Sequence, residues 1–179
     1  IWRLDAIGKV RVKSPHGNAY GEHGVYNLDD SIIVLTGSKP VKLITPTDII
    51  VANRQIEFWE KRQMAVARGD AVAKRAEKEL HAEVLAAYFK RNKMGETELH
   101  RVEAFDKVKV KTPKDTAISQ RAVYNAKSGI ATLSGDVKII RGENRLTGCS
   151  AEVNLNTGIS RIRTCDIDTK GGTNRVKGI

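Results

Sequence analysis

The stretch YNAKSGIATLSG, residues 124–135, has a close copy earlier in the chain, YNLDDSIIVLTG at residues 26–37. Residue 124 against residue 26 gives an offset of 98, and the neighbouring words keep it. Words that recur at one long spacing indicate that a single structural unit is used twice. We therefore expect two related modules in one chain.

The echo extends on both sides of these two phrases. Upstream, IWRLDA at 1–6 aligns with LHRVEA at 99–104; downstream, after two extra residues around Pro40, VKLI at 41–44 aligns with VKII at 137–140. The identical pairs at the offset of 98 include Ala6 and Ala104, Lys9 and Lys107, Val10 and Val108, Val12 and Val110, Lys13 and Lys111, Pro15 and Pro113, and Ala19 and Ala117. We expect one elongated domain over 1–179, with a module at about 1–60, a middle segment at about 61–98 and a second module at about 99–179.

Both modules carry strand signals. KVRVKS at 9–14 and KVKVKT at 107–112 alternate apolar with basic residues, so their valines share one face and their charges the other. The outward set is Lys9, Arg11, Lys13, Lys107, Lys109 and Lys111. Polar clusters such as NLDDS, NAKSG, SGD, RGEN and NTG are expected turns. Short strands between such turns predict an all-β fold with antiparallel pairing, in a sandwich or an open barrel.

The middle segment is ambiguous from its residues alone. GDAVAKRAEKELHAEVLAAYFKRNKMG at 69–95 is rich in good helix formers, and Leu80, Val84, Ala87 and Tyr88 recur at helical spacing. The same region also reads as strands around a Gly-Asp turn, with Leu80, Ala82 and Val84 on one face. Tertiary context decides such cases, and the flanking modules are both β.

Composition narrows the classes of function. The net charge of +10 favours an anionic partner, but aromatic residues at 5% do not supply the stacking surface of a single-strand nucleic-acid binder, so we expect no nucleic acid. No catalytic motif is present, and His16, His23, His81 and His100 lie in separate segments, so we expect no enzyme and no cofactor. Cys149 and Cys165 lack a zinc-binding spacing, so no metal is expected; they form one disulfide or stay free.

The ordered words of the second module resemble one known family. VYN, LTG and VKL in the first module and AVYNAKSGIATLSGDVKIIRGENRLTG with AEVNLNTGISRI in the second are similar to the OstA-like domain of the LptA family of lipopolysaccharide export proteins. IEFWEKRQMAVARGDAVA and LHAEVLAAYF resemble the strands that such proteins carry between two modules, which favours middle strands over a helix. Two residues depart from the family pattern: Cys149 follows the glycine of LTG, and Asp106 stands where the first module has Gly8.

The resemblance implies a twisted, incompletely closed β jelly roll that holds the acyl chains of lipid A between two walls. It implies a periplasmic, non-catalytic carrier of lipopolysaccharide, joined end to end with other Lpt bridge components or with itself. A continuous apolar trough is required, because each exposed methylene costs roughly 0.8 kcal/mol. The expected lining of this lipid-binding groove is Val10, Val12, Leu35, Val41, Leu43, Ile56, Phe58, Val108, Val110, Leu133, Val137, Ile139, Leu146, Val153 and Leu155. The outward lysines meet lipid phosphates only at its rim.

The two ends of the sheet are expected to expose strand edges to which another protein chain can add a strand. One edge is expected at the motif that begins at Ile1 and the other at the apolar segment NRVKGI, residues 174–179. Such a contact is heterologous and gives filaments instead of closed rings. Two alternatives remain: a membrane-anchored LptC-like relative cut from its anchor, typically with one module instead of two, and a β-repeat scaffold whose interior admits no ligand.

Overall fold

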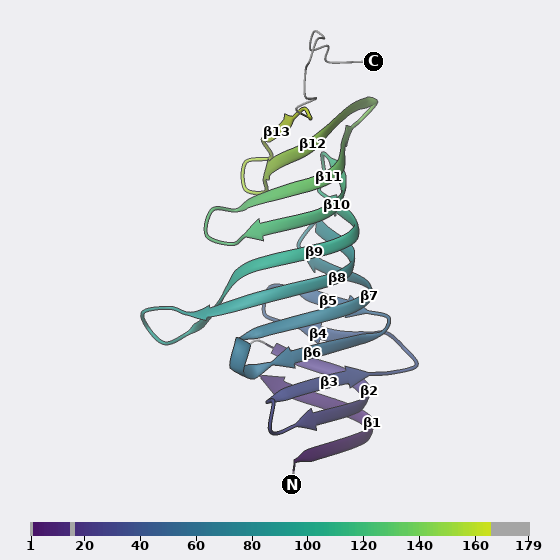
Figure 1. Cartoon of the computed structure of the whole chain (residues 1–179), viewed down its shortest axis with the longest axis vertical. Helices are drawn as coiled ribbons and strands as arrows, with labels where there is room; N and C mark the ends of the chain where they lie inside the picture. Colours follow the sequence, from purple (N-terminus) through teal and green to yellow (C-terminus); the bar gives the residue numbers. More distant parts are fainter. Residues whose placement is uncertain (1, 15–16, 166–179) are drawn as a thin grey trace.

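The computed structural model describes residues 2–14 and 17–165, and within them the chain forms one antiparallel sheet of 13 strands. The strands stack along the long axis from β1 near one end to β13 near the other (Figure 1). Their order is β13-β12-β11-β10-β9-β8-β7-β5-β4-β2-β3-β6, with β1 on β2 and β6 also on β7. Ile1, Pro15, His16 and the NRVKGI segment lie outside the described residues.

The elements follow the repeat. In chain order they are β1 (Arg3–Ser14), β2 (Gly17–Asn27), β3 (Ile32–Thr36), β4 (Val41–Ile44), β5 (Ile49–Ala52), β6 (Gln55–Trp59), the 3₁₀ turn η1 (Glu60–Arg62), β7 (Met64–Arg75), β8 (Lys78–Arg91), β9 (Thr97–Lys111), β10 (Thr116–Asn125), β11 (Ile130–Arg141), β12 (Asn144–Asn154) and β13 (Ser160–Arg163). The all-β prediction is confirmed, as is the strand interpretation of the middle segment.

Extra residues in the middle of the long strands bend the sheet. In β9, Asp106 and Lys107 both have positive φ, and the register with β10 shifts between Ser119 and Arg121. Gly8 has positive φ at the equivalent place in β1, so Asp106 preserves the bulge that glycine makes in the first module. A bulge bends its strand and increases the local twist. The bends divide the sheet into two walls.

The SGD sequence at 134–136 was expected to be a turn, and this prediction is wrong. Gly135 and Asp136 have positive φ but lie inside β11, where the register with β12 shifts between Ser134 and Val137. Gly-Asp is a turn signal because both residues tolerate left-handed backbone. The same property serves a bulge, and here the strand continues through it.

Each wall carries an apolar row on its inner face. The row of the first wall crosses the sheet through paired residues Ala6, Gly24, Leu35, Ile56, Ala67, Leu85, Ala104, Ala122, Leu133, Ala151 and Ile162. The row of the second wall runs through Val12, Ala19, Leu43, Ile50, Ala73, Leu80, Val110, Ala117, Ile139 and Leu146. Most of these side chains belong to one buried cluster. The inner surface is therefore apolar from one end of the sheet to the other.

The predicted strand faces agree with the observed burial. Val108 and Val110 are buried and Val10 and Val12 are half-buried, whereas the basic residues between them are all exposed. Val84 departs from the strand interpretation of the middle segment. It pairs with Arg68 and Phe105, while Leu85 takes the inner position, because the sheet bends between His81 and Val84.

The first module differs from the second at Pro40. β2 pairs with both β3 and β4, which are separate strands on either side of Gly37–Pro40. In the second module, a single continuous strand, β11, takes the place of β3 and β4 and pairs with β10. Proline lacks the N–H that a ladder needs, and two additional residues must be accommodated here. The insertion thus splits one long strand into β3 and β4, and both of these still pair with β2.

A disulfide joins β12 to the chain that follows β13. Cys149 and Cys165 are bonded, with their Cα atoms 5.0 Å apart. The sequence left this pairing open. The bond closes the β12–β13 hairpin at the last strands of the sheet.

Candidate functional site: an apolar trough between two walls

Among residues 2–14 and 17–165, the inner faces of the two walls line cavities that include three of about 310, 180 and 340 Å³. The first two share the lining residues Asp48, Ala73, Arg75, Leu99 and Val102. The first and third share Phe89 and Thr97. Because neighbouring cavities share lining residues, they are successive parts of one trough.

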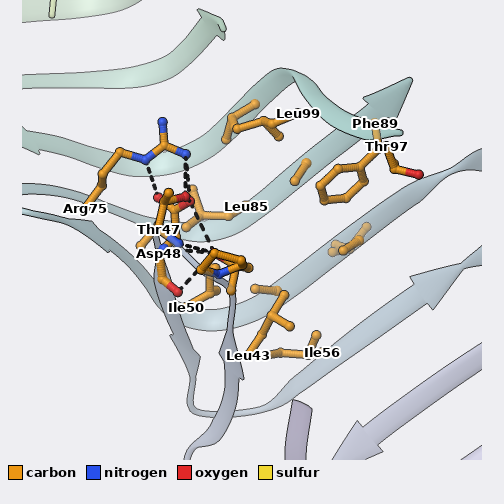
Figure 2. Close-up of a pocket in the computed structure, with 18 residues that line it drawn as sticks. Leu43, Thr47, Asp48, Ile50, Ile56, Arg75, Leu85, Phe89, Thr97 and Leu99 are labelled. Atoms are coloured by element: carbon orange, nitrogen blue, oxygen red, sulfur yellow. Dashed lines mark hydrogen bonds and ion pairs between the residues drawn. The ribbon is translucent and has the colours of Figure 1, made fainter. Parts of the chain in front are cut away.

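The first cavity is lined mainly by apolar side chains. Leu43 and Ile50 come from the second wall and Ile56, Leu85 and Phe89 from the first, as Figure 2 shows. Small residues keep the space open, because an alanine fills far less of a site than a leucine would: Ala65, Ala67, Ala73 and Ala87 all line it. Apolar concave sites with a few polar groups are typical of ligand pockets.

The polar groups of this cavity lie at its mouth. Asp48 follows the turn Thr45–Pro46–Thr47 and receives two hydrogen bonds of 2.6 Å from Nε and Nη2 of Arg75, the last residue of β7 (Figure 2). Partial burial would raise the pKa of Asp48, but the hydrogen bonds from Arg75, Thr47 and Thr45 and the charge of Arg75 outweigh it, so the pKa lies below its ordinary value. The pair presents no net charge to the trough.

The same turn recurs in the second module. Thr112–Pro113–Lys114–Asp115 repeats the Thr-Pro-x-Asp order, and Asp115 receives hydrogen bonds of 2.5 and 2.6 Å from Nε and Nη2 of Arg141. These hydrogen bonds are the main reason why the pKa of Asp115 is lowered. Both turns also bond internally, the threonine hydroxyl accepting from the aspartate N–H. Residues 48 and 115 are 67 positions apart instead of 98, and the turns join β4 to β5 and β9 to β10, so this turn recurs independently of the repeat at 98.

Two basic side chains reach from the second wall to the first. Lys78 Nζ donates a hydrogen bond to the carbonyl of Leu155, and Nη2 of Arg141 lies 3.4 Å from the carbonyl of Gly158. Leu155 and Gly158 belong to the turn between β12 and β13. The second cavity lies beside this contact, since Lys78 and Leu155 both line it.

The structure gathers nearly all of the predicted groove residues on the inner face. Leu43 and Ile56 line the first cavity, Val110 and Leu155 the second, and Val12 and Phe58 the third. Val10 packs half-buried against the cluster. The remaining members are buried within it: Leu35, Val41, Val108, Leu133, Val137, Ile139 and Val153. Leu146 is 49% exposed, although it pairs with Ile139 on the same face.

Several lining residues were missed by the sequence analysis. Leu85 and Phe89 lie in the middle segment, whose structure the pattern did not settle. Leu99 and Val102 lie in LHRVEA, which the repeat had already aligned with IWRLDA, so a signal was available. The Thr-Pro-x-Asp turns were also visible as a repeated word.

The family model described as LptA/(LptD N-terminal domain) LPS transport protein matches residues 49–159, more than half of the chain. The chain belongs to this family. The match includes most of the strands that line the first two cavities, although β4 with Leu43 precedes it, and it agrees with the expectation of a transport protein instead of an enzyme.

A solved structure shows the same fold. It is the crystal structure of LptH, the LptA homologous periplasmic component of the conserved lipopolysaccharide transport device from Pseudomonas aeruginosa. The TM-score is 0.60 at 16% sequence identity, over 74% of this chain and 93% of that one. No curated protein sequence matches the chain. The incompletely closed antiparallel sheet is therefore the LptA-like fold.

Residues 2–14 and 17–165 contain no group of three histidine, cysteine or acidic side chains placed to hold a metal ion. Over the same residues, no helix has the length and apolar character that crossing a membrane requires.

Proposed function

We propose that this LptA-family chain is a periplasmic carrier of lipopolysaccharide, with the acyl chains of lipid A in the trough and the headgroup outside it. The observation that carries the proposal is the unbroken inner row from Ala6 to Ile162, beside cavities that share their walls. Burying acyl chains there removes methylenes from water at roughly 0.8 kcal/mol each. The lining proposed is the predicted groove set together with Ile50, Leu85, Phe89 and Leu99.

The disulfide supports the proposed compartment. Disulfides persist in oxidising compartments such as the bacterial periplasm and are rare in the cytosol. Cys149 and Cys165 have a Cα separation within the range that a disulfide needs. LptH, which has this fold, is described as a periplasmic component.

The two ends of the sheet support assembly into a bridge. Among the described residues, β1 pairs only with β2 and β13 only with β12, so each presents a strand edge. Beside the β1 edge, Trp2, Leu4 and Ile7 are large apolar residues exposed to solvent. Open edges recruit further strands, and head-to-tail addition of one copy or of another Lpt component extends the trough.

Photocrosslinking to lipopolysaccharide tests the carrier function. Probes at Val110 and Ile139 report on the inner face, and a probe at Lys109 is the matched outward control, one residue away on the same strand. We expect crosslinks from the inner pair alone. Crosslinks from neither inner position would leave a β-repeat scaffold without a lipid ligand.

A further inference from the structure

Lys78 is a cation that spans the mouth of the trough. It begins β8, two residues before Leu80, which lies on the inner side of the second wall. Its ammonium group donates to the carbonyl of Leu155, which lies 77 residues away at the end of the first wall. The contact thus joins the two edges between which a lipid headgroup would have to lie.

The turn that Lys78 contacts is well defined. The side-chain oxygen of Asn154 accepts hydrogen bonds of 2.9 and 3.0 Å from the backbone N–H groups of Asn156 and Thr157. Leu155 and Asn156 line the second cavity opposite Leu80 and Val110. The position of the Leu155 carbonyl is therefore fixed beside an apolar space of about 180 Å³.

The other charges at this part of the mouth are neutralised by partners. Arg75 is paired with Asp48, and Arg141 with Asp115. Glu79 contacts Lys74, His81 and Lys111, and the hydrogen bonds from Lys74 and His81 lower the pKa of Glu79 to about 2. Asp48, Asp115 and Glu79 therefore form ion pairs with other basic residues and not with Lys78.

Lys78 differs from these neighbours. It is in none of the ion pairs formed by residues 2–14 and 17–165, and its ammonium meets a neutral carbonyl. A cation next to an apolar cavity, without a carboxylate partner, complements a ligand that is both acylated and anionic. Hydrogen bonds from an ammonium to a phosphate oxygen are about twice as strong as those between neutral groups.

We propose that Lys78 binds a phosphate monoester of the carried lipid, and that the Leu155 carbonyl occupies the position of a phosphate oxygen when no lipid is bound. The assignment rests on the proposed carrier function, because the acyl chains in the second cavity place the phosphate at the mouth. Binding exchanges an ammonium–carbonyl contact for an ammonium–phosphate contact.

The test compares two lipids with the same acyl chains, diphosphoryl lipid A and its dephosphorylated form. A photocrosslinking probe at Val110 in the full chain gives the lipid concentration at half-maximal yield. We expect the wild type to prefer the phosphorylated lipid by about tenfold, which is typical of a hydrogen bond to a charged group. Lys78→Met removes this preference, so that the two lipids crosslink at similar concentrations, while Lys78→Arg retains the preference.

Lys61 provides the matched control. Its Nζ also donates to a backbone carbonyl in a turn, that of Asp29 at 2.5 Å, but Lys61 lines none of the three cavities. Lys61→Met removes one positive charge and one contact of the same kind. We expect it to keep the tenfold preference, which separates the site at Lys78 from the general effect of net charge.

Inorganic phosphate distinguishes a lipid from a free anion. At constant ionic strength and in large excess, it should leave crosslinking of the phosphorylated lipid intact; displacement by phosphate alone would overturn the assignment to a lipid. An undiminished preference in Lys78→Met would also overturn the proposal while the carrier function stands. Failure of both lipids to crosslink to the wild type would instead reject the carrier function and this site with it.

Discussion

Arg75 donates two hydrogen bonds of 2.6 Å to the carboxylate of Asp48, one from Nε and one from Nη2. In the second module, Arg141 donates to the carboxylate of Asp115 through the same two nitrogens. In both cases the aspartate ends a Thr-Pro-x-Asp turn and the arginine ends a strand of the same wall. The same pair of contacts therefore occurs twice, although residues 48 and 115 are 67 positions apart and so are not equivalent in the repeat at 98; only the Asp48–Arg75 pair lines the first two cavities.

The Asp48–Arg75 pair should make stability depend on acid pH. The pKa of Asp48 is lower in the folded chain than its ordinary value of about 3.9. Its stabilising effect is therefore complete above that value and disappears as the pH falls through the folded pKa. We expect Asp48→Asn to lower the free energy of unfolding by about 1 kcal/mol at neutral pH, because the pair is bidentate but partly exposed.

Urea unfolding of wild type and Asp48→Asn between neutral pH and pH 3 checks this. The difference in free energy of unfolding between the two proteins should shrink as the pH drops below about 4, because the wild-type carboxyl is then protonated and, like the asparagine amide, carries no charge. A difference that stays constant down to pH 3 would contradict the assigned ion pair.

Reduction of the disulfide should destabilise the last strands. Cys149 and Cys165 are 16 residues apart, and closing a loop of this length stabilises a folded chain by about 3 kcal/mol in the chain-entropy account. We expect a reductant to lower the urea midpoint of the wild type. Amide hydrogen exchange should become faster first at Ser160–Arg163, which form β13.

The double variant Cys149→Ser with Cys165→Ser is the control for reductant effects elsewhere. It should start at the stability of the reduced wild type and show no further response. If oxidised and reduced wild type unfold at the same urea concentration, the bond contributes nothing to the folded state.

Two bulge glycines should differ in their tolerance of alanine. A Cβ on Gly69 would lie 2.7 Å from Cβ and 2.9 Å from the backbone N of Arg54, whereas a Cβ on Gly8 would meet nothing within 4 Å. Both residues have positive φ, so each substitution costs about 1–2 kcal/mol of backbone strain. Only Gly69→Ala adds a clash with backbone atoms, so we expect it to be the more destabilising by at least about 1 kcal/mol.

Denaturant unfolding of Gly8→Ala and Gly69→Ala, measured side by side, decides the matter. Equal losses would show that strain in the bulge alone sets the cost and that β7 can move away from Arg54. A larger loss for Gly8→Ala would contradict the geometry of both bulges.

The repeat and the alternation were sufficient to predict the β modules, the inner valines and the outward lysines. They worked because a strand has a strict period of two, which survives in Val108 and Val110 and in the exposed Lys109 between them. Alternation fails where a bulge changes the parity, and this is why Leu85, not Val84, reaches the inner face. A pattern read along one strand cannot show where the sheet bends.

The middle segment was ambiguous because its alanines serve two purposes. Alanine favours helices in isolation, yet Ala67, Ala71 and Ala82 are buried in β7 and β8, where a larger side chain would fill the space between the walls. Pairing with strands on both sides supplies the stability that local propensity does not. The contact between Lys78 and Leu155 could not be predicted either, since it joins the middle segment to the second module across the fold.

Filling the first cavity should weaken lipid binding without unfolding the chain. Ala87 is half-buried on the first wall and lines a cavity of about 310 Å³, so Ala87→Phe has room for its ring. The ring excludes methylenes of an acyl chain; losing two of them at roughly 0.8 kcal/mol each lowers affinity by about tenfold. Thr132→Phe adds the same ring to the exposed outer face of β11 and should leave affinity unchanged. The measurement is half-saturation of lipopolysaccharide crosslinking from Ile139 in both variants, beside their urea midpoints. Unchanged binding in a folded Ala87→Phe variant would place the acyl chains elsewhere in the trough.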